Sequence, residues 1–197
     1  MPSNIHVFPS PEVVAQKLSE RIVLQIRKTI NQKKICTLLL SGGTTPKLLY
    51  QNLAQSDVQW SSVHIFLSDE RFVPMDSSES NFRMISEMFV DKIQIPKENV
   101  HPILTEFTTK EEVAENYEKE LRAIFSSDFR EVHSTVSSDH SALDSHLHGN
   151  DMIMWDINIL GIGEDCHTAA LFPHTKSLHE KEKWVIGVTA QNRRKKE

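Results

Sequence analysis

The chain has 197 residues, of which 39% are hydrophobic and 25% are charged, and its formal net charge is −5. A chain of this length can fold as one domain around a hydrophobic core, and the composition is unlike that of a disordered protein. The acidic balance argues against nucleic-acid binding, which normally needs a concentrated basic face. No apolar run approaches the roughly 18 residues that a membrane span requires, so we expect no membrane partner.

The N-terminal sequence and the cysteine content indicate a cytoplasmic protein. MPSNIHVFPSPEVV lacks the basic and then apolar pattern of a secretory signal. Two cysteines, Cys36 and Cys166, do not make a disulfide framework. Cys36 lies inside an apolar run, where a free cysteine behaves as a small buried hydrophobe. We expect a single domain over residues 1–197.

A long helix is predicted from Pro11 to about Lys33. Ser10 followed by Pro11 is typical of a helix N-cap and the first helical position. Beyond them, apolar residues recur every four positions. They predict one apolar face on this helix, made by Val14, Leu18, Ile22, Ile26 and Ile30.

The first strand is predicted over residues 35–40. This run, ICTLLL, is short and continuously apolar, as in strands that are covered on both faces of a sheet. The polar sequence SGGTT ends it. Thr45 followed by Pro46 then restarts a helix, which extends through Leu53 by the same cap-and-proline pattern.

The second strand is predicted over residues 63–67, followed by the polar loop SDERFVPMDSSES and a helix over residues 81–92. Thr109, with Glu112 three residues later, forms a capping box that opens another helix. The apolar residues of that helix share one face: Val113, Tyr117, Leu121 and Phe125.

The second half of the chain is less regular. Residues 126–150 are rich in Ser, His and Asp with almost no apolar periodicity, so we expect a flexible surface insertion there. A third strand is predicted over residues 152–160 and a fourth over residues 184–189. Strands that alternate with helices predict an α/β domain with a largely parallel sheet.

The fourth predicted strand is followed directly by QNRRKKE, with no amphipathic helix to cover it. A parallel sheet needs apolar cover on both faces. We therefore expect a fold that is truncated at its C-terminus and low in stability. It would leave an uncovered sheet edge through which chains could self-associate.

Three predicted strands end in polar loops: SGGTTP, SDERFVP and GIGEDCHT. In parallel sheets these loops project from one edge, and ligands bind in the crevice beyond the carboxyl ends of the strands. The convergence of the three loops is the main indication of a functional site.

The loop SGGTTP suits an anion. Gly42 and Gly43 let backbone N–H groups approach a ligand, and the helix that follows presents the positive end of its dipole. The spacing to Lys47 is not that of a P-loop. The alternative is a tight strand-to-helix turn in which Thr45 caps the helix.

Asp69, Glu70 and Arg71 directly follow the second predicted strand. Arg71 is suited to paired hydrogen bonds with a phosphate or carboxylate. The alternative is a surface ion pair among the three residues, which would contribute little to stability. Their position at a strand end favours a functional role.

In the third loop, Asp165 and His167 are separated by one residue, so their side chains can lean towards a common region. A carboxylate beside an imidazole fixes its tautomer and raises its basicity, as suits a general base. A metal is disfavoured because the loop supplies a single histidine. Cys166 as a nucleophile is the weaker alternative, since neighbouring residues rarely aim at the same atom.

A second group of potential metal ligands lies in the sequence DSHLH, within the Ser- and His-rich segment. It contains Asp144, His146 and His148. Other histidines in that segment are equally incidental in their spacing, so we do not expect a functional metal site.

Taken together, the three loops resemble the 6-phosphogluconolactonase family. That family carries SGGSTP, then DER-x-VP with a nearby SN, then LG-x-G-x-DGHTASLFP. This chain has SGGTTP, then DERFVP with Ser80-Asn81, then LGIGEDCHTAALFP, in the same order. The related glucosamine-6-phosphate isomerases and deaminases carry DEY and an HIAFNEP-like run at these places, so both differences favour the lactonase.

The resemblance implies a doubly wound α/β fold with helices on both faces of the sheet. It also implies hydrolysis of 6-phospho-D-glucono-1,5-lactone to 6-phosphogluconate in the oxidative pentose phosphate pathway, without metal or cofactor. His167 falls on the family's catalytic histidine, which activates water, and Asp165 would orient it. The substrate-binding residues would be Ser41, Gly42, Gly43, Thr44, Asp69, Arg71 and Asn81.

Three departures from the family pattern bear on activity. Cys166 replaces a glycine, which matters if that residue needs a positive φ. Ala170 replaces a serine, and the chain ends at Glu197 with only RRKK to supply basic residues nearby. The alternatives to an active lactonase are an amino-sugar-phosphate isomerase or deaminase, and a non-catalytic relative that binds sugar phosphates or a partner chain.

Overall fold

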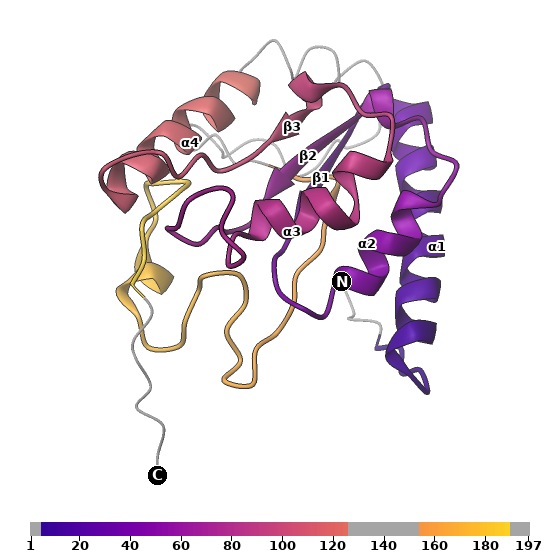
Figure 1. Cartoon of the computed structure of the whole chain (residues 1–197), viewed down its shortest axis with the longest axis horizontal. Helices are drawn as coiled ribbons and strands as arrows, with labels where there is room; N and C mark the ends of the chain where they lie inside the picture. The colour runs from indigo at the N-terminus through magenta and orange to yellow at the C-terminus, as the bar shows by residue number, and fades with distance from the viewer. Residues whose placement is uncertain (1–4, 126–153, 190–197) are drawn as a thin grey trace, which may run out of the picture.

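The computed structural model describes residues 5–125 and 154–189, and its centre is a parallel sheet (Figure 1). Within these residues the sheet has four strands in the order β3-β2-β1-β4. All neighbouring strands run parallel. Their bounds are β1 (Cys36–Leu40), β2 (Val63–Leu67), β3 (Val100–His101) and β4 (Ile157–Asn158).

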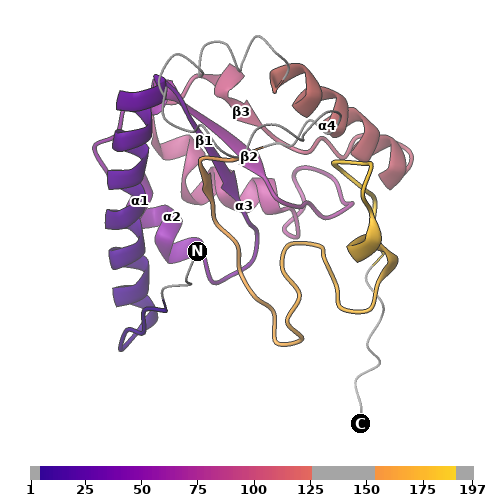
Figure 2. The same ribbon diagram turned by 180° about the vertical axis from the view of Figure 1, so that it is seen from behind.

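Helices lie on both faces of the sheet. They are α1 (Pro11–Lys33), α2 (Lys47–Ala54), α3 (Asn81–Met88) and α4 (Lys110–Ile124). In Figure 1, α2 and α3 lie in front of the sheet, and the reverse view in Figure 2 shows α4 on the opposite face. The chain winds outwards from β1 to β3 and then crosses back to β4, so right-handed connections place α4 on the other side. This confirms the expected doubly wound α/β fold.

The reversal of strand order occurs between β1 and β4. Ligand sites of open α/β sheets form beside such a switch point, beyond the carboxyl ends of the strands. The loop SGGTTP follows β1, and the loop GIGEDCHT follows β4 after Leu160. The topology therefore sets the first and third loops on either side of the crevice.

Two buried tyrosines fix the ends of the strands where the loops begin. The Tyr50 hydroxyl, from α2, accepts from the backbone N–H of Ser41 (3.1 Å) and donates to the Ser41 carbonyl (2.6 Å). The Tyr117 hydroxyl, from α4, accepts from the N–H of Leu67 at 3.2 Å. Burial raises the pKa of both phenols, so both keep the proton they donate. Helices on opposite faces thus hold β1 and β2 at the site edge.

Asp156 joins β4 to the rest of the sheet. Its Oδ2 accepts from the backbone N–H of Thr37 (2.9 Å) and from the Thr37 hydroxyl (3.0 Å), while Oδ1 lies 2.7 Å from Lys33 Nζ. The Asp156 side chain is only 9% exposed. A buried carboxylate with three donors is satisfied, so it locks β4 in register with β1.

The predicted apolar face of α1 is wrong at its N-terminal end. The helix has the expected bounds, and the Ser10 hydroxyl accepts from the N–H of Val13. Its buried stripe, however, contains Ile22 and Ile26 but not Val14 (41% exposed) or Leu18 (39% exposed). Residues four apart rotate by about 40° at each step, so a strict four-residue repeat turns away from the core over three turns.

Several element bounds also differ from the predictions. Thr45 does not cap α2, whose N-cap is Pro46 without a side-chain hydrogen bond. The helix predicted over residues 81–92 is α3 followed by a separate 3₁₀ turn, Val90–Lys92. The third predicted strand shrinks to β4 in the part that the structure describes. The capping box of Thr109 and Glu112 is confirmed.

The strand predicted over residues 184–189 is not formed. The backbone N–H groups of Trp184 and Val185 instead donate to Glu118 Oε2, at 3.1 and 3.2 Å. The guanidinium of Arg122 lies 4.1 Å from the Trp184 ring centroid. A carboxylate on α4 therefore takes the donors that a neighbouring strand would have used.

The segment 126–150, predicted to be a flexible insertion, lies outside the described residues. Among the helices that the structure describes, none combines the length and apolarity needed to cross a membrane.

Candidate active site

The loops after β1 and β2 meet at Asn81, the first residue of α3. A Cβ atom on Gly42 would lie 1.9 Å from Asn81 Oδ1, so only glycine fits there. Asn81 Nδ2 donates to the carbonyl oxygen and to Oδ2 of Asp69, both at 3.1 Å. Gly43 has φ of +96°, a conformation that favours glycine. The structure thus brings the predicted residues Gly42, Asp69 and Asn81 together.

Around these contacts, Ser41 is buried and bonded to Tyr50. Thr44 accepts through its carbonyl from the N–H of Lys47. The Asp69 carboxylate also accepts from the Ser68 hydroxyl at 2.8 Å. One oxygen of Asp69 is therefore held by Ser68 and the other by Asn81, which fixes the direction of the carboxylate.

Arg71 is exposed. Within the residues that the structure describes, its guanidinium forms no ion pair, with Asp69, Glu70 or any other carboxylate. The alternative of a surface ion pair within the sequence DER is therefore wrong. The cation is available to a ligand.

Sequence reasoning named Glu70 beside Asp69 and Arg71 but did not predict what it binds. Its carboxylate accepts from two backbone N–H groups at the start of α3, those of Asn81 (2.7 Å) and Phe82 (2.8 Å). It also accepts from the Ser80 hydroxyl at 3.0 Å and from the N–H of Arg71 at 2.6 Å. The sequence Ser80-Asn81 indicates the start of a helix. It does not indicate which carboxylate accepts from the first N–H groups of that helix.

In the third loop, the Asp165 carboxylate contacts Nδ1 of the His167 ring, as predicted. The loop folds tightly, because the N–H of Gly163 donates to the His167 carbonyl (2.8 Å) and that of Cys166 to the Gly163 carbonyl (2.9 Å). The ring of Phe172 lies 4.9 Å from the imidazole, centroid to centroid.

This pairing defines the chemistry open to His167. A carboxylate on Nδ1 holds the proton there, which leaves the lone pair on Nε2 to accept another. The His167 side chain is 35% exposed. Among the described residues, Nε2 has no hydrogen-bond partner. The imidazole can therefore take a proton from a bound water, as a general base does.

The residues beside His167 show how tightly this loop is folded. Cys166 is exposed and has φ of +66°, in the region that favours glycine. Thr168 carries a buried hydroxyl that finds no hydrogen-bond partner within the described part of the chain.

Cys36, by contrast, lies in the core, where burial raises the pKa of its thiol to about 12. Its thiol therefore stays protonated and plays no part in the site.

A cleft of about 630 Å³ adjoins the second and third loops. Its lining includes Ser68, Asp69 and Glu70 from the second loop and Ala169–Leu171, which follow the third. The rest lies between the ends of β1 and β2, the apolar face of α4 and residues 184–188. Neither Arg71 nor His167 lines the cleft. Glu70 and Phe72, on either side of Arg71, do line it, and so does Ala169, two residues after His167.

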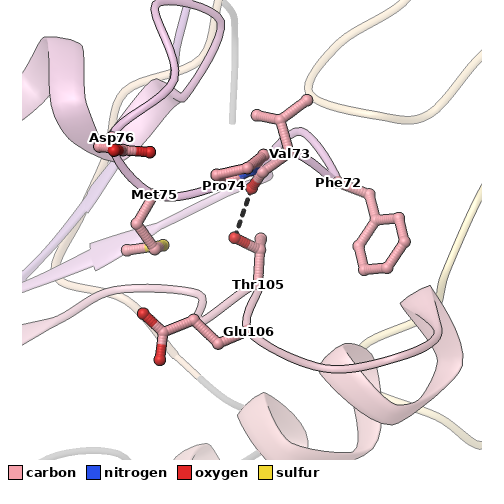
Figure 3. Close-up of a pocket in the computed structure, with 7 residues that line it drawn as sticks. All are labelled: Phe72, Val73, Pro74, Met75, Asp76, Thr105 and Glu106. Carbon is pink, nitrogen blue, oxygen red and sulfur yellow. Dashed lines mark hydrogen bonds between the residues drawn. The ribbon is translucent and has the colours of Figure 1, made fainter.

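A second hollow, of about 650 Å³, lies between the remainder of the loop after β2 and residues 105–106 (Figure 3). The Thr105 hydroxyl donates to the Val73 carbonyl across it at 2.6 Å. It contains none of the predicted site residues.

Within the described residues, no three His, Cys, Asp or Glu side chains gather as metal ligands. The sequence DSHLH lies outside them.

Comparison with known proteins identifies the family. The model described as "Glucosamine-6-phosphate isomerases/6-phosphogluconolactonase" matches residues 9–197. A 6-phosphogluconolactonase of Synechocystis sp. is 33% identical over 178 residues, which cover 90% of this chain and 66% of that protein. One of Nostoc sp. is 31% identical over 185 residues, covering 94% of this chain and 69% of the relative.

Solved structures of 6-phosphogluconolactonases are similar to this chain as well. The 6-phosphogluconolactonase of Thermotoga maritima superposes with a TM-score of 0.64 at 32% identity, covering 80% of this chain and 60% of that one. That of Trypanosoma brucei gives 0.74 at 25% identity, covering 96% and 72%. The chain spans about two thirds of the length of these relatives. It belongs to the 6-phosphogluconolactonase family, within the group that also contains the glucosamine-6-phosphate isomerases.

Proposed function

We propose that this chain hydrolyses 6-phospho-D-glucono-1,5-lactone to 6-phospho-D-gluconate, the lactonase step of the oxidative pentose phosphate pathway. The observation that carries the proposal is the Asp165–His167 pair, held in the tight loop that follows β4. Within the described part of the chain Nε2 of this imidazole has no partner, so it can accept from a water molecule. Family membership supports the same activity.

In the proposed reaction, His167 Nε2 takes a proton from water as the water oxygen attacks the lactone carbonyl carbon. The tetrahedral intermediate collapses as the bond from that carbon to the ring oxygen breaks. The proton on His167 then passes to the leaving ring oxygen, so the histidine returns to its starting state. In this scheme His167 activates the water, so the proposed step uses no metal or cofactor.

The substrate would be held by the first two loops. Arg71 offers an exposed guanidinium to the phosphate. The loop Ser41–Thr44 leads into α2, which starts without a side-chain cap, so the N–H groups of its first turn, other than that of Lys47, suit the same anion. The fixed carboxylate of Asp69 and the amide of Asn81 would contact sugar hydroxyls. We place this reaction in the cytoplasm, as the composition led us to expect.

The test is proton release from freshly generated 6-phosphogluconolactone, corrected for its spontaneous opening. We expect the chain to accelerate hydrolysis and to act more weakly on gluconolactone without the phosphate. Ammonia release from glucosamine 6-phosphate, with no lactone hydrolysis, would assign the chain to the isomerase and deaminase side of the group. Binding of 6-phosphogluconate with neither activity would identify a non-catalytic relative.

A further inference from the structure

The carboxylate of Glu70 is the point at which the loop after β2 is joined to α3. Four donors converge on it within 3.0 Å: the N–H groups of Arg71, Asn81 and Phe82, and the Ser80 hydroxyl. Both oxygens are used, since Oε1 accepts from Arg71 and Asn81 while Oε2 accepts from Ser80 and Phe82. A carboxylate at a helix N-terminus is also favoured by the helix dipole.

These bonds fix the residues on either side of Glu70. Its own carboxylate binds the N–H of the next residue, Arg71, which closes the backbone turn from which the guanidinium projects. On the other side, Asp69 is held by Asn81, whose backbone N–H is in turn bound to Glu70. The directions of both Asp69 and Arg71 therefore depend on one carboxylate that lies between them in sequence.

The same bonds reach the first loop. Asn81 lies against Gly42 so closely that no Cβ atom fits between them. The position of Asn81 is set by the start of α3, where Glu70 takes the first two N–H groups of the helix. Displacement of α3 would move the Asn81 amide away from Gly42 and from Asp69 together.

We propose that Glu70 is a positioning residue, which aligns Asp69 and Arg71 with the Gly42 loop for binding of a sugar phosphate without touching the substrate itself. A consequence is that the N-terminus of α3 is occupied by Glu70 and does not bind the phosphate. The inference rests on the proposed function for its substrate. Its structural part can be tested independently.

The test compares Glu70→Gln with Glu87→Gln. Glutamine keeps the shape of the side chain but replaces one acceptor oxygen with an NH₂ group and removes the charge. Glu87 is a matched control, because it lies on the same helix in an exposed ion pair with Arg83. Hydrogen bonds to charged groups contribute enough that we expect the Asn81 and Phe82 amides to exchange about 10-fold faster or more in Glu70→Gln. In Glu87→Gln they should exchange as in the parent.

The second readout is kinetic. If Glu70 positions binding groups, Glu70→Gln should raise KM for the phosphorylated lactone about 10-fold and change kcat much less. Should Glu70→Gln fail to fold, Ser80→Ala removes one donor from the same carboxylate, together with the helix-capping bond from the Arg83 N–H to the Ser80 hydroxyl. It should shift KM in the same direction by a smaller factor. Affinity for 6-phosphogluconate, measured by calorimetry, should weaken in parallel with KM.

The outcomes separate the two proposals. A parent chain that binds 6-phosphogluconate without hydrolysing lactone would refute the lactonase proposal, while exchange and calorimetry would still decide the role of Glu70. Unchanged amide exchange in Glu70→Gln would overturn the positioning role. So would faster exchange with unchanged KM and unchanged product affinity, because Glu70 would then be a helix cap alone.

Discussion

Gly163 lies directly against the ring of His167. A Cβ atom at Gly163 would be 2.2 Å from Cε1 and 2.3 Å from Nδ1 of that imidazole, and 3.0 Å from Oδ1 of Asp165. No real Cβ atom approaches so closely. The absence of a side chain at Gly163 is therefore what lets the histidine lie beside its carboxylate in this loop.

Gly163→Ala should accordingly displace the imidazole and lower kcat for lactone hydrolysis by about 10²-fold, the effect of a misplacement of roughly 1 Å. Gly161→Ala is the matched control, since a Cβ atom there meets nothing within 4 Å. The two variants are compared by steady-state kinetics. Equal activity in both would mean that the position of His167 does not matter to the reaction.

Arg71→Ala should raise KM mainly for the phosphorylated lactone, by about 10- to 100-fold, because it removes charge-assisted hydrogen bonds to the phosphate. Gluconolactone without the phosphate should be hydrolysed by Arg71→Ala and the parent at similar rates. Kinetics on the two substrates provide the check. A loss of equal size on both would show that Arg71 acts on something other than the phosphate.

Cys166→Gly should raise the thermal midpoint by a few degrees. A non-glycine residue at a φ of +66° carries a cost of roughly 1–2 kcal/mol, part of which is offset by the greater freedom of glycine in the unfolded chain. Cys166→Ser keeps a Cβ atom at the same φ and should melt with the parent. If the serine variant were stabilised as much as the glycine variant, the thiol and not the backbone would be responsible.

Dialysis against a chelator should leave lactone hydrolysis unchanged, because His167 and not a metal activates the water in the proposed step, and the third loop offers a single histidine. Deletion of Ser134 to His148, which removes the sequence DSHLH, should also leave most of the activity. The prediction fails if both treatments abolish activity and zinc restores the dialysed chain.

The sequence predicted those elements that are determined by local chemistry. Ser10 with Pro11, and Thr109 with Glu112, mark helix starts through hydrogen bonds within a few residues, and both are confirmed. That the three loops leave one edge of the sheet was predictable for a different reason, because the carboxyl ends of parallel strands share that edge.

Features that depend on distant partners could not be predicted. β3 has two residues, too few for any periodicity, and it exists because β2 offers it hydrogen bonds. Residues 184–189 have the composition of a strand, yet Glu118 on α4 takes the backbone N–H groups of Trp184 and Val185. In the site, the roles of Glu70 and Gly163 follow only once α3 and the His167 ring are in place.

The most direct test of the account is the rate of 6-phosphogluconolactone hydrolysis by the parent chain and by His167→Ala, measured side by side as proton release. Loss of a general base should lower the turnover rate by roughly 10²- to 10⁴-fold while the variant remains folded by circular dichroism. A folded His167→Ala variant that keeps the turnover of an active parent would contradict the central claim that His167 activates the water.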